Sequence, residues 1–120
     1  MSRKRIVSTL TRLGLSREEI RIYVFLSMEG PRETKAIAKA MKINQNELDS
    51  RLEILKNKGL VMIINSVVPS QFYAIPFENA LDLLVETNLK LAQNTEQNKS
   101  AILEDWSSIL KNNSSIKPVQ

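Results

Sequence analysis

The sequence contains no cysteine and no histidine, so two common kinds of reactive and metal-binding side chain are missing. This absence excludes zinc fingers, thiol catalysis and imidazole acid–base chemistry together. The lack of cysteine also agrees with a reducing interior, where disulfides are rare. No apolar run approaches the roughly 20 residues that a membrane-spanning helix needs, and no signal peptide opens the chain. We therefore expect a cytoplasmic protein.

Glycine is also scarce, which bears on phosphate binding and catalysis. The three glycines each stand at the expected end of a helix, so the sequence has no glycine-rich phosphate loop. Catalysis would need paired carboxylates or an activated lysine. The acidic residues are instead scattered along expected helices, at spacings typical of caps and ion pairs. We therefore expect no enzyme activity, no metal ion and no cofactor.

The charge is unevenly distributed along a chain that is long enough for one globular domain and one appendage. The net charge is +4. Residues 1–60 hold 13 Lys and Arg against 7 Asp and Glu, whereas residues 61–120 hold 4 against 6. A basic first half favours a polyanion as partner. The alternative is ordinary scatter of surface charge.

Two helices are expected in the first quarter of the chain. The first ends at Gly14 and has apolar residues at helical spacing, namely Ile6, Val7, Leu10 and Leu13. A capping box formed by Ser16 and Glu19 opens the second helix. This second helix is apolar nearly all round, so we expect it to be buried, with Tyr23 and Phe25 in the core.

The centre of the sequence predicts a helix, a tight turn, a second helix and a β-hairpin. Thr34 is the expected N-cap of the first helix, and Asn44 with Glu47 forms the expected cap of the second. The inward-facing residues of the two helices are Ile37, Ala38, Met41, Leu48, Leu52 and Leu55. Two β-prone runs follow at 60–64 and 71–75. This is the plan of a winged helix-turn-helix, which presents the first turns of its second helix to a DNA groove.

A further helical region is expected from Pro76 to Asn113. It carries an apolar stripe whose predicted role is dimerisation, made of Val85, Leu89, Ala92, Leu103, Trp106 and Leu110. The stripe is interrupted at 93–100, where every residue is polar, so the region is one long helix or a pair of helices. An apolar seam needs a partner, and a second copy is the simplest one. The alternative is a seam that folds back on its own domain.

Short motifs spread over about residues 10–92 carry a resemblance to a known family. They are Leu13-Gly14-Leu15-Ser16, Glu19, Tyr23, Gly30-Pro31, Ile37-Ala38, Leu52, Leu55, Lys58-Gly59-Leu60-Val61, Tyr73-Ala74-Ile75-Pro76 and Ala80-Leu81. In this combination they resemble the TrmB family of mainly archaeal transcriptional regulators. The resemblance implies a dimeric, DNA-binding winged-helix protein. Many family members also carry a C-terminal sugar-sensing domain, which these 120 residues do not accommodate, so we expect no sugar sensing.

The sequence departs from the family pattern at two places. The family usually has a Pro-Arg-Ser-like start and an aromatic residue in the first turns of its recognition helix, whereas residues 44–49 read Asn-Gln-Asn-Glu-Leu-Asp. The family's wing normally carries Arg or Lys, whereas residues 65–71 carry neither. Both differences remove positive charge that would otherwise contact phosphate.

DNA contacts are expected from both helices of the helix-turn-helix. Lys35 and Lys39 are expected to contact phosphate and position the protein, because the first helix crosses the DNA backbone in this geometry. Gln45 and Asn46 are expected to read bases, because side-chain amides pair bidentately with adenine. The complete predicted DNA-binding set is Arg32, Thr34, Lys35, Lys39, Asn44, Gln45, Asn46, Ser50 and Arg51. The N-terminal cluster Arg3–Arg5 is the next candidate.

Several residues of the second helix have alternative roles. Asn44 is expected to act as a cap more than as a reader of bases. Arg51 reaches phosphate or guanine, or else it forms a surface ion pair with Glu47 one turn back. Asp49 and Glu53 face solvent or phosphate, and in the second case they would oppose DNA binding.

These observations predict a mainly α fold with a small β-hairpin, that is, a winged helix-turn-helix followed by a long C-terminal helix or helical pair. Residues 1–76 form the expected DNA-binding domain, 77–113 the dimerisation helices and 114–120 a tail. We predict a sequence-specific transcriptional regulator that binds double-stranded DNA as a homodimer, with a recognition helix at about 45–58. The alternative is a winged-helix protein–protein interaction module that has lost DNA binding, as the neutral wing allows.

Overall fold

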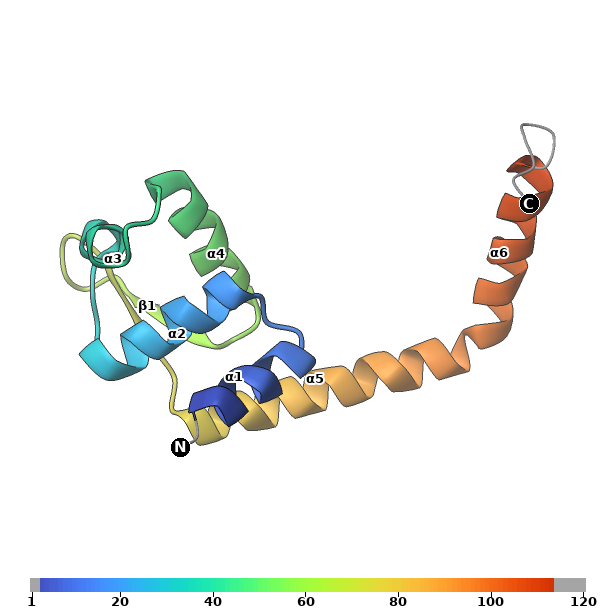
Figure 1. Ribbon diagram of the computed structural model, residues 1–120, viewed down its shortest axis with the longest axis horizontal. Coiled ribbons are helices and arrows are strands. Elements are labelled where there is room, and N and C mark those ends of the chain that lie inside the picture. The colour runs from blue at the N-terminus through green and yellow to red at the C-terminus, as the bar shows by residue number, and fades with distance from the viewer. Residues whose placement is uncertain (1–2, 114–120) are drawn as a thin grey trace. The chain divides into compact units, whose positions relative to one another are not determined.

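The computed structural model describes residues 3–113, and these form a mainly helical fold with one β-hairpin (Figure 1). In chain order the elements are α1 (Arg3–Arg12), α2 (Arg17–Glu29), α3 (Thr34–Met41), α4 (Gln45–Asn57), β1 (Val61–Ile64), β2 (Gln71–Ala74), α5 (Phe77–Gln97) and α6 (Lys99–Asn113). The predicted fold class is confirmed. The tail predicted at 114–120 lies outside the described residues.

The chain divides into two compact units between Glu86 and Thr87. The first unit contains α1 to β2 and the opening turns of α5. These turns belong to it because the side chains of Ala80 and Leu84 are buried among its core residues. The second unit contains the rest of α5 and α6.

The core of the first unit is built around α2 and α4. Helix α2 packs against α1, α4 and β2, and α4 packs also against α3 and β1. The buried apolar residues are Leu10, Leu15, Ile20, Ile22, Tyr23, Leu26, Ile37, Met41, Leu48, Leu52, Leu55, Leu60, Val61, Ala80 and Leu84. The prediction that Tyr23 lies in the core is confirmed, while Phe25 is half-buried against it. The Tyr23 hydroxyl donates to the carbonyl of Ile75, which ties α2 to the end of the hairpin.

The hairpin pairs β1 and β2 in antiparallel register, with Val61 opposite Ala74 and Ile64 opposite Gln71. A third segment joins the sheet through a single isolated bridge between Arg32 and Phe72. The Arg32 N–H donates to the Phe72 carbonyl over 3.0 Å, and the Phe72 N–H donates back over 2.8 Å. The loop before α3 is therefore fixed to the hairpin.

The helix starts differ in how well the sequence predicted them. The capping box of Ser16 and Glu19 at the start of α2 is confirmed in both directions. The prediction that Thr34 caps α3 is wrong, because Thr34 is the first helical residue and Glu33 is the N-cap. The Glu33 side chain makes no capping hydrogen bond. The α3 start is instead fixed beside the backbone bridge at Arg32.

The C-terminal helical region consists of two helices that meet at Asn98. Helix α5 continues through most of the polar segment and ends at Gln97. At the junction, the Asn98 side-chain amide and its backbone N–H both donate to the Asn94 carbonyl, over 2.9 and 3.0 Å. The Asn94 carbonyl thus accepts both bonds, and a side chain that bonds back to position i−4 often accompanies a bend in a helix. Within 3–113, no helix has both the length and the apolar character that crossing a bilayer requires.

Candidate nucleic-acid interface

A tight turn at Lys42 and Ile43 joins α3 to α4. Lys42 has a left-handed backbone conformation, with φ 56° and ψ 47°, and its N–H donates to the carbonyls of Ala38 and Lys39. The Ile43 N–H donates to the Ala38 carbonyl over 3.0 Å. These bonds satisfy carbonyls at the end of α3, so the turn ends one helix and sets the start of the next.

The inner face of α4 anchors the helix in the core and leaves its outer face to solvent. Leu48 and Leu55 are 0% exposed and Leu52 is 2% exposed. Buried positions that recur every three or four residues leave the opposite side of a helix free. The exposed residues of α4 are Gln45, Asn46, Glu47, Asp49, Ser50, Glu53, Ile54, Lys56 and Asn57.

Asn44 caps α4 as predicted. Its side-chain oxygen accepts hydrogen bonds from the backbone N–H groups of Asn46, over 2.8 Å, and Glu47, over 3.3 Å. Among the described contacts there is no return bond from the Glu47 side chain, so only half of the predicted capping box forms. The cap occupies the Asn44 oxygen and leaves its amide NH₂ group for other contacts.

The first turn of α4 exposes two side-chain amides. The Gln45 amide nitrogen donates to a carboxylate oxygen of Asp49 over 3.0 Å. The side chains of Asn46 and Ser50 are exposed and make no hydrogen bond within the part of the chain that the structure describes. The exposed start of α4 therefore carries donors and acceptors suited to base edges, with one carboxylate beside them.

The basic residues next to this surface lie on and before α3. Lys35 and Lys39 are one helical turn apart and exposed, and neither forms an ion pair within residues 3–113. Arg32 is more constrained, since it donates to the Pro31 carbonyl over 2.7 Å and lies 3.4 Å from a Glu29 carboxylate oxygen. Thr34 is half-buried. Lys35 and Lys39 are thus the basic residues of this group that pair with no acidic side chain among the described residues.

Arg51 contacts a buried carboxylate that sequence analysis did not identify as its partner. Glu19 is 4% exposed, and its oxygens lie 3.5 Å from an Arg51 guanidinium nitrogen and 3.4 Å from the Lys58 ammonium. The Ser16 N–H donates to the same carboxylate over 3.1 Å. The expected alternative for Arg51, a pair with Glu47, is therefore wrong. A buried carboxylate requires such compensation, so these contacts tie α4 to the start of α2.

The hairpin tip is uncharged and exposed. Val68 is 97% exposed, and the Ser70 hydroxyl donates to the Asn65 side-chain oxygen over 3.0 Å across the tip. The segment between the strands has no Lys or Arg. A wing of this kind has no side chain for ionic contact with phosphate, so the positive charge of this surface comes from α3.

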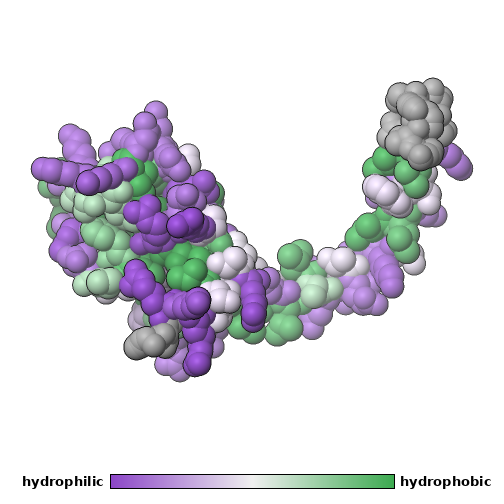
Figure 2. Space-filling model, in the orientation of Figure 1, coloured by the Kyte–Doolittle hydropathy of each residue, from purple (hydrophilic) through white to green (hydrophobic). Residues whose placement is uncertain are grey.

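The predicted dimerisation stripe is exposed along its length. The exposed fractions are 45% for Val85, 57% for Leu89, 55% for Leu103, 57% for Trp106 and 53% for Leu110, and Ala92 is also exposed. Figure 2 shows hydrophobic surface on α5 and α6. Exposed apolar residues that gather on both sides of the polar segment 93–100 are typical of an interaction surface.

Comparison with known proteins gives a family and a fold. The family model described as sugar-specific transcriptional regulator TrmB matches residues 10–78, more than half of the chain. A search of curated proteins found no match.

Three solved structures share the fold at low identity. The multiple antibiotic resistance repressor MarR is 12% identical with a TM-score of 0.54, covering 96% of this chain and 86% of that one. A MarR-like transcriptional regulator from Thermotoga maritima is 14% identical with a TM-score of 0.50, covering 92% and 93%. A MarR-family regulator from Silicibacter pomeroyi is 21% identical with a TM-score of 0.51, covering 94% and 80%. These similarities show a winged-helix fold.

Proposed function

The chain belongs to the TrmB family of transcriptional regulators, and from this premise we propose that it binds double-stranded DNA as a homodimer, with α4 as the recognition helix. The family is one of regulators and not of enzymes. The observation that carries the proposal is the start of α4, where Gln45, Asn46 and Ser50 are exposed while Leu48 and Leu52 fix the helix in the core. A rigid helix with polar first turns suits the major groove.

We assign the contacts with bases to Gln45, Asn46 and Ser50. A side-chain amide forms a bidentate pair with adenine N6 and N7, and a hydroxyl pairs with several base edges. The Gln45–Asp49 hydrogen bond holds the Gln45 amide in a defined orientation before DNA arrives. Asn44 contributes only its NH₂ group, because its oxygen caps the helix.

We assign the contacts with phosphate to Lys35 and Lys39, with Thr34 and Arg32 beside them. Such contacts set register and orientation without reading sequence. Arg51 contributes through its ion pair with Glu19, which supports the packing of α4. Because the wing is neutral, we expect only about three or four phosphate contacts per protomer. The affinity for DNA should therefore fall less steeply with salt than is usual for a regulator.

The homodimer in the proposal is formed by the exposed stripe from Val85 to Leu110. An isologous pairing would bury the same apolar residues on both copies and would place two recognition helices on a pseudo-palindromic site.

The second candidate function, a protein–protein module, is favoured by one observation. The outer face of α4 carries Asp49 and Glu53, whose charges oppose a phosphate backbone.

A salt titration of duplex binding tests the proposal. Lys35→Ala should weaken binding to every duplex and flatten the log–log salt slope by about 0.9, the value for one phosphate contact. Lys56→Ala, an exposed lysine at the far end of α4, is the matched control and should leave the slope unchanged.

The base contacts are tested on a preferred site selected from random duplexes. Gln45→Ala and Asn46→Ala should each weaken binding to that site by about 1–3 kcal/mol and change binding to random DNA little. Asn57→Ala, an exposed amide at the end of the same helix, is the control. No affinity for duplex DNA even at low salt would reject the proposal and favour the protein–protein module.

A further inference from the structure

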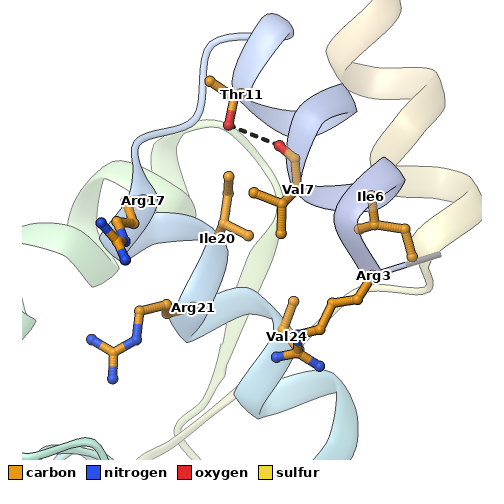
Figure 3. Close-up of a pocket in the computed structure, with 8 residues that line it drawn as sticks. All are labelled: Arg3, Ile6, Val7, Thr11, Arg17, Ile20, Arg21 and Val24. Atoms are coloured by element: carbon orange, nitrogen blue, oxygen red, sulfur yellow. Dashed lines mark hydrogen bonds between the residues drawn. The ribbon is translucent and has the colours of Figure 1, made fainter. Parts of the chain in front are cut away.

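A groove of about 850 Å³ lies between α1 and α2, outside the surface assigned to DNA (Figure 3). Its volume falls within the range of pockets that hold small molecules, about 300–1,000 Å³. The residues that line it are Arg3, Ile6, Val7, Thr11, Arg17, Ile20, Arg21 and Val24. None of them belongs to the set assigned to DNA under the proposed function, and Arg3 alone belongs to the N-terminal cluster that is the next candidate for DNA contact.

The floor of the groove is apolar. Ile6 and Val7 come from α1 and are 36% and 39% exposed, although they are aliphatic. Ile20 and Val24 stand one turn apart on α2, and in Figure 3 the side chains of Val7, Ile20 and Val24 lie between the two helices. The Thr11 hydroxyl is occupied, since it donates to the Val7 carbonyl over 2.8 Å. This floor suits an apolar body and offers little to a purely polar ligand.

Three guanidinium groups stand at the edge of this apolar floor. In Figure 3, Arg17 and Arg21 extend from consecutive turns of α2 with their guanidinium groups directed away from Val7, while Arg3 extends from α1 beside Val24. In the part of the chain that the structure describes, none of the three forms an ion pair or a side-chain hydrogen bond. Among the described residues that line the groove, none is acidic. Three like charges without a counter-charge favour an anion as occupant.

We propose that the α1–α2 groove binds a small amphiphilic organic anion, a carboxylate with an aliphatic or aromatic body. The carboxylate pairs with guanidinium groups at the rim, which match its planar geometry. The body covers Val7 and Val24, which lie beside the buried Ile20. A DNA phosphate would contact only the arginines and leave the apolar floor uncovered, so the floor favours an amphiphilic anion over DNA. A neutral hydrocarbon would contact only the floor, so the arginines favour an amphiphilic anion over a hydrocarbon.

The test is a titration of the isotope-labelled full chain with octanoate, followed by amide chemical shifts. Octanoate should shift amides of α1 and α2 around the groove. The uncharged analogue 1-octanol, which has the same chain length, should bind the same place about tenfold more weakly, because it lacks the charge-assisted hydrogen bonds.

Two variants test whether the arginines bind the carboxylate, and one tests whether the apolar floor binds the aliphatic body. A further variant outside the groove is the control. Arg21→Gln should weaken octanoate about tenfold and leave 1-octanol unchanged, and Arg17→Gln serves the same purpose if the first variant folds poorly. Arg12→Gln removes the same charge from α1 outside the groove and should leave octanoate binding unchanged. Val7→Trp, at a partly exposed position, should obstruct the apolar floor and weaken binding of both ligands.

Four results would each overturn the proposal. The first is equal binding of octanoate and 1-octanol, and the second is no binding of octanoate anywhere on the chain. The third is a loss of octanoate binding in Arg12→Gln as large as that in Arg21→Gln, which would indicate general charge attraction. The fourth is a shift of the α1 and α2 amides with protein concentration in the absence of ligand, which would assign the groove to a second copy. Since none of these readouts uses DNA, they are independent of the DNA-binding test.

Discussion

Leucine residues in the two units of this chain have opposite environments. In the first unit, Leu10, Leu26 and Leu48 are at most 1% exposed, whereas Leu103 and Leu110 of the second unit are more than half exposed. Each of these leucines belongs to an apolar stripe of its own helix, in which apolar residues recur every three or four positions. Burial of one such side chain contributes about 1.5–3 kcal/mol, so the first unit has gained this free energy within one chain and the second has not. Apolar periodicity therefore identifies a face that needs burial, but not what buries it.

Removal of one leucine from each unit should give the largest difference between them. Leu52→Ala should lower the free energy of unfolding by about 2–5 kcal/mol, because Leu52 is 2% exposed and its loss leaves a cavity. Leu103→Ala, measured in dilute protein where dimers dissociate, should change it by less than about 0.5 kcal/mol. Urea denaturation followed by circular dichroism measures both. Equal losses would mean that Leu103 is buried within its own chain.

The second unit should respond to protein concentration instead. The double change Leu103→Lys and Leu110→Lys should raise the dimer dissociation constant by about 100-fold or more, because it places charge in an apolar seam. Sedimentation velocity over a concentration series measures this. Glu104→Lys is the matched control, because it makes the same change in net charge at a position off the stripe. A parent chain that stays monomeric at tens of micromolar, roughly where weak interfaces fill, would contradict the homodimer.

The comparison between buried and exposed groups also applies to charge. Glu19→Gln should destabilise the first unit by about 1–3 kcal/mol, because it weakens contacts of a buried carboxylate with Arg51 and Lys58. Glu29→Gln disrupts the surface pair with Arg32, in which both side chains are at least 40% exposed, and should change stability by less than about 0.5 kcal/mol. Thermal unfolding of both variants and of the parent chain measures these two changes in stability.

The smallest expected effect is on the pH dependence of the stability of the first unit. Burial raises the pKa of the Tyr23 hydroxyl above 10.0, and a side-chain hydrogen bond with Ser27 partly offsets this. The unfolded chain then loses the phenolic proton before the folded one does, so stability is intact below pH 10.0 and falls as the pH rises above it. Tyr23→Phe should remove this dependence and lose about 1 kcal/mol for the hydrogen bond to Ile75.

A control keeps the tyrosine prediction specific. Tyr73→Phe leaves Tyr23 in place and should retain the loss of stability above pH 10.0. Denaturant titrations of the parent and both variants, each at neutral and alkaline pH, make the measurement. An identical alkaline loss in Tyr23→Phe would assign the effect to another group.

Local features of this fold could be predicted from the sequence, because they depend on residues a few positions apart. The capping box of Ser16 and Glu19, the Asn44 cap and the inward face of Leu48, Leu52 and Leu55 are all of this kind. The start of α3 was misplaced at Thr34, since Glu33 supplies the N-cap without a side-chain hydrogen bond that would mark it. The break at Asn98 remained open between one helix and two, because polar residues are compatible with either.

The candidate DNA-binding surface shows the same difference between local features and long-range contacts. The sequence placed Gln45 and Asn46 at the start of an exposed helix, and the structure has both of them exposed there. The partner of Arg51 was missed, because Glu19 lies 32 positions earlier in the chain and its spacing already explained a cap. Its position in the first turn, directly before the apolar run from Ile20 to Leu26, is the signal that this carboxylate would be buried and would need further partners.

By itself, the sequence determined the order of helices and strands, the apolar face of each helix and the family motifs, because these follow from short-range spacing and side-chain chemistry. Only the tertiary structure decided which distant groups meet. It bridged Arg32 to Phe72, brought Arg51 and Lys58 to Glu19, and set three unpaired arginines around an apolar groove. Such contacts depend on how packed helices orient their faces, and a linear pattern does not contain that orientation.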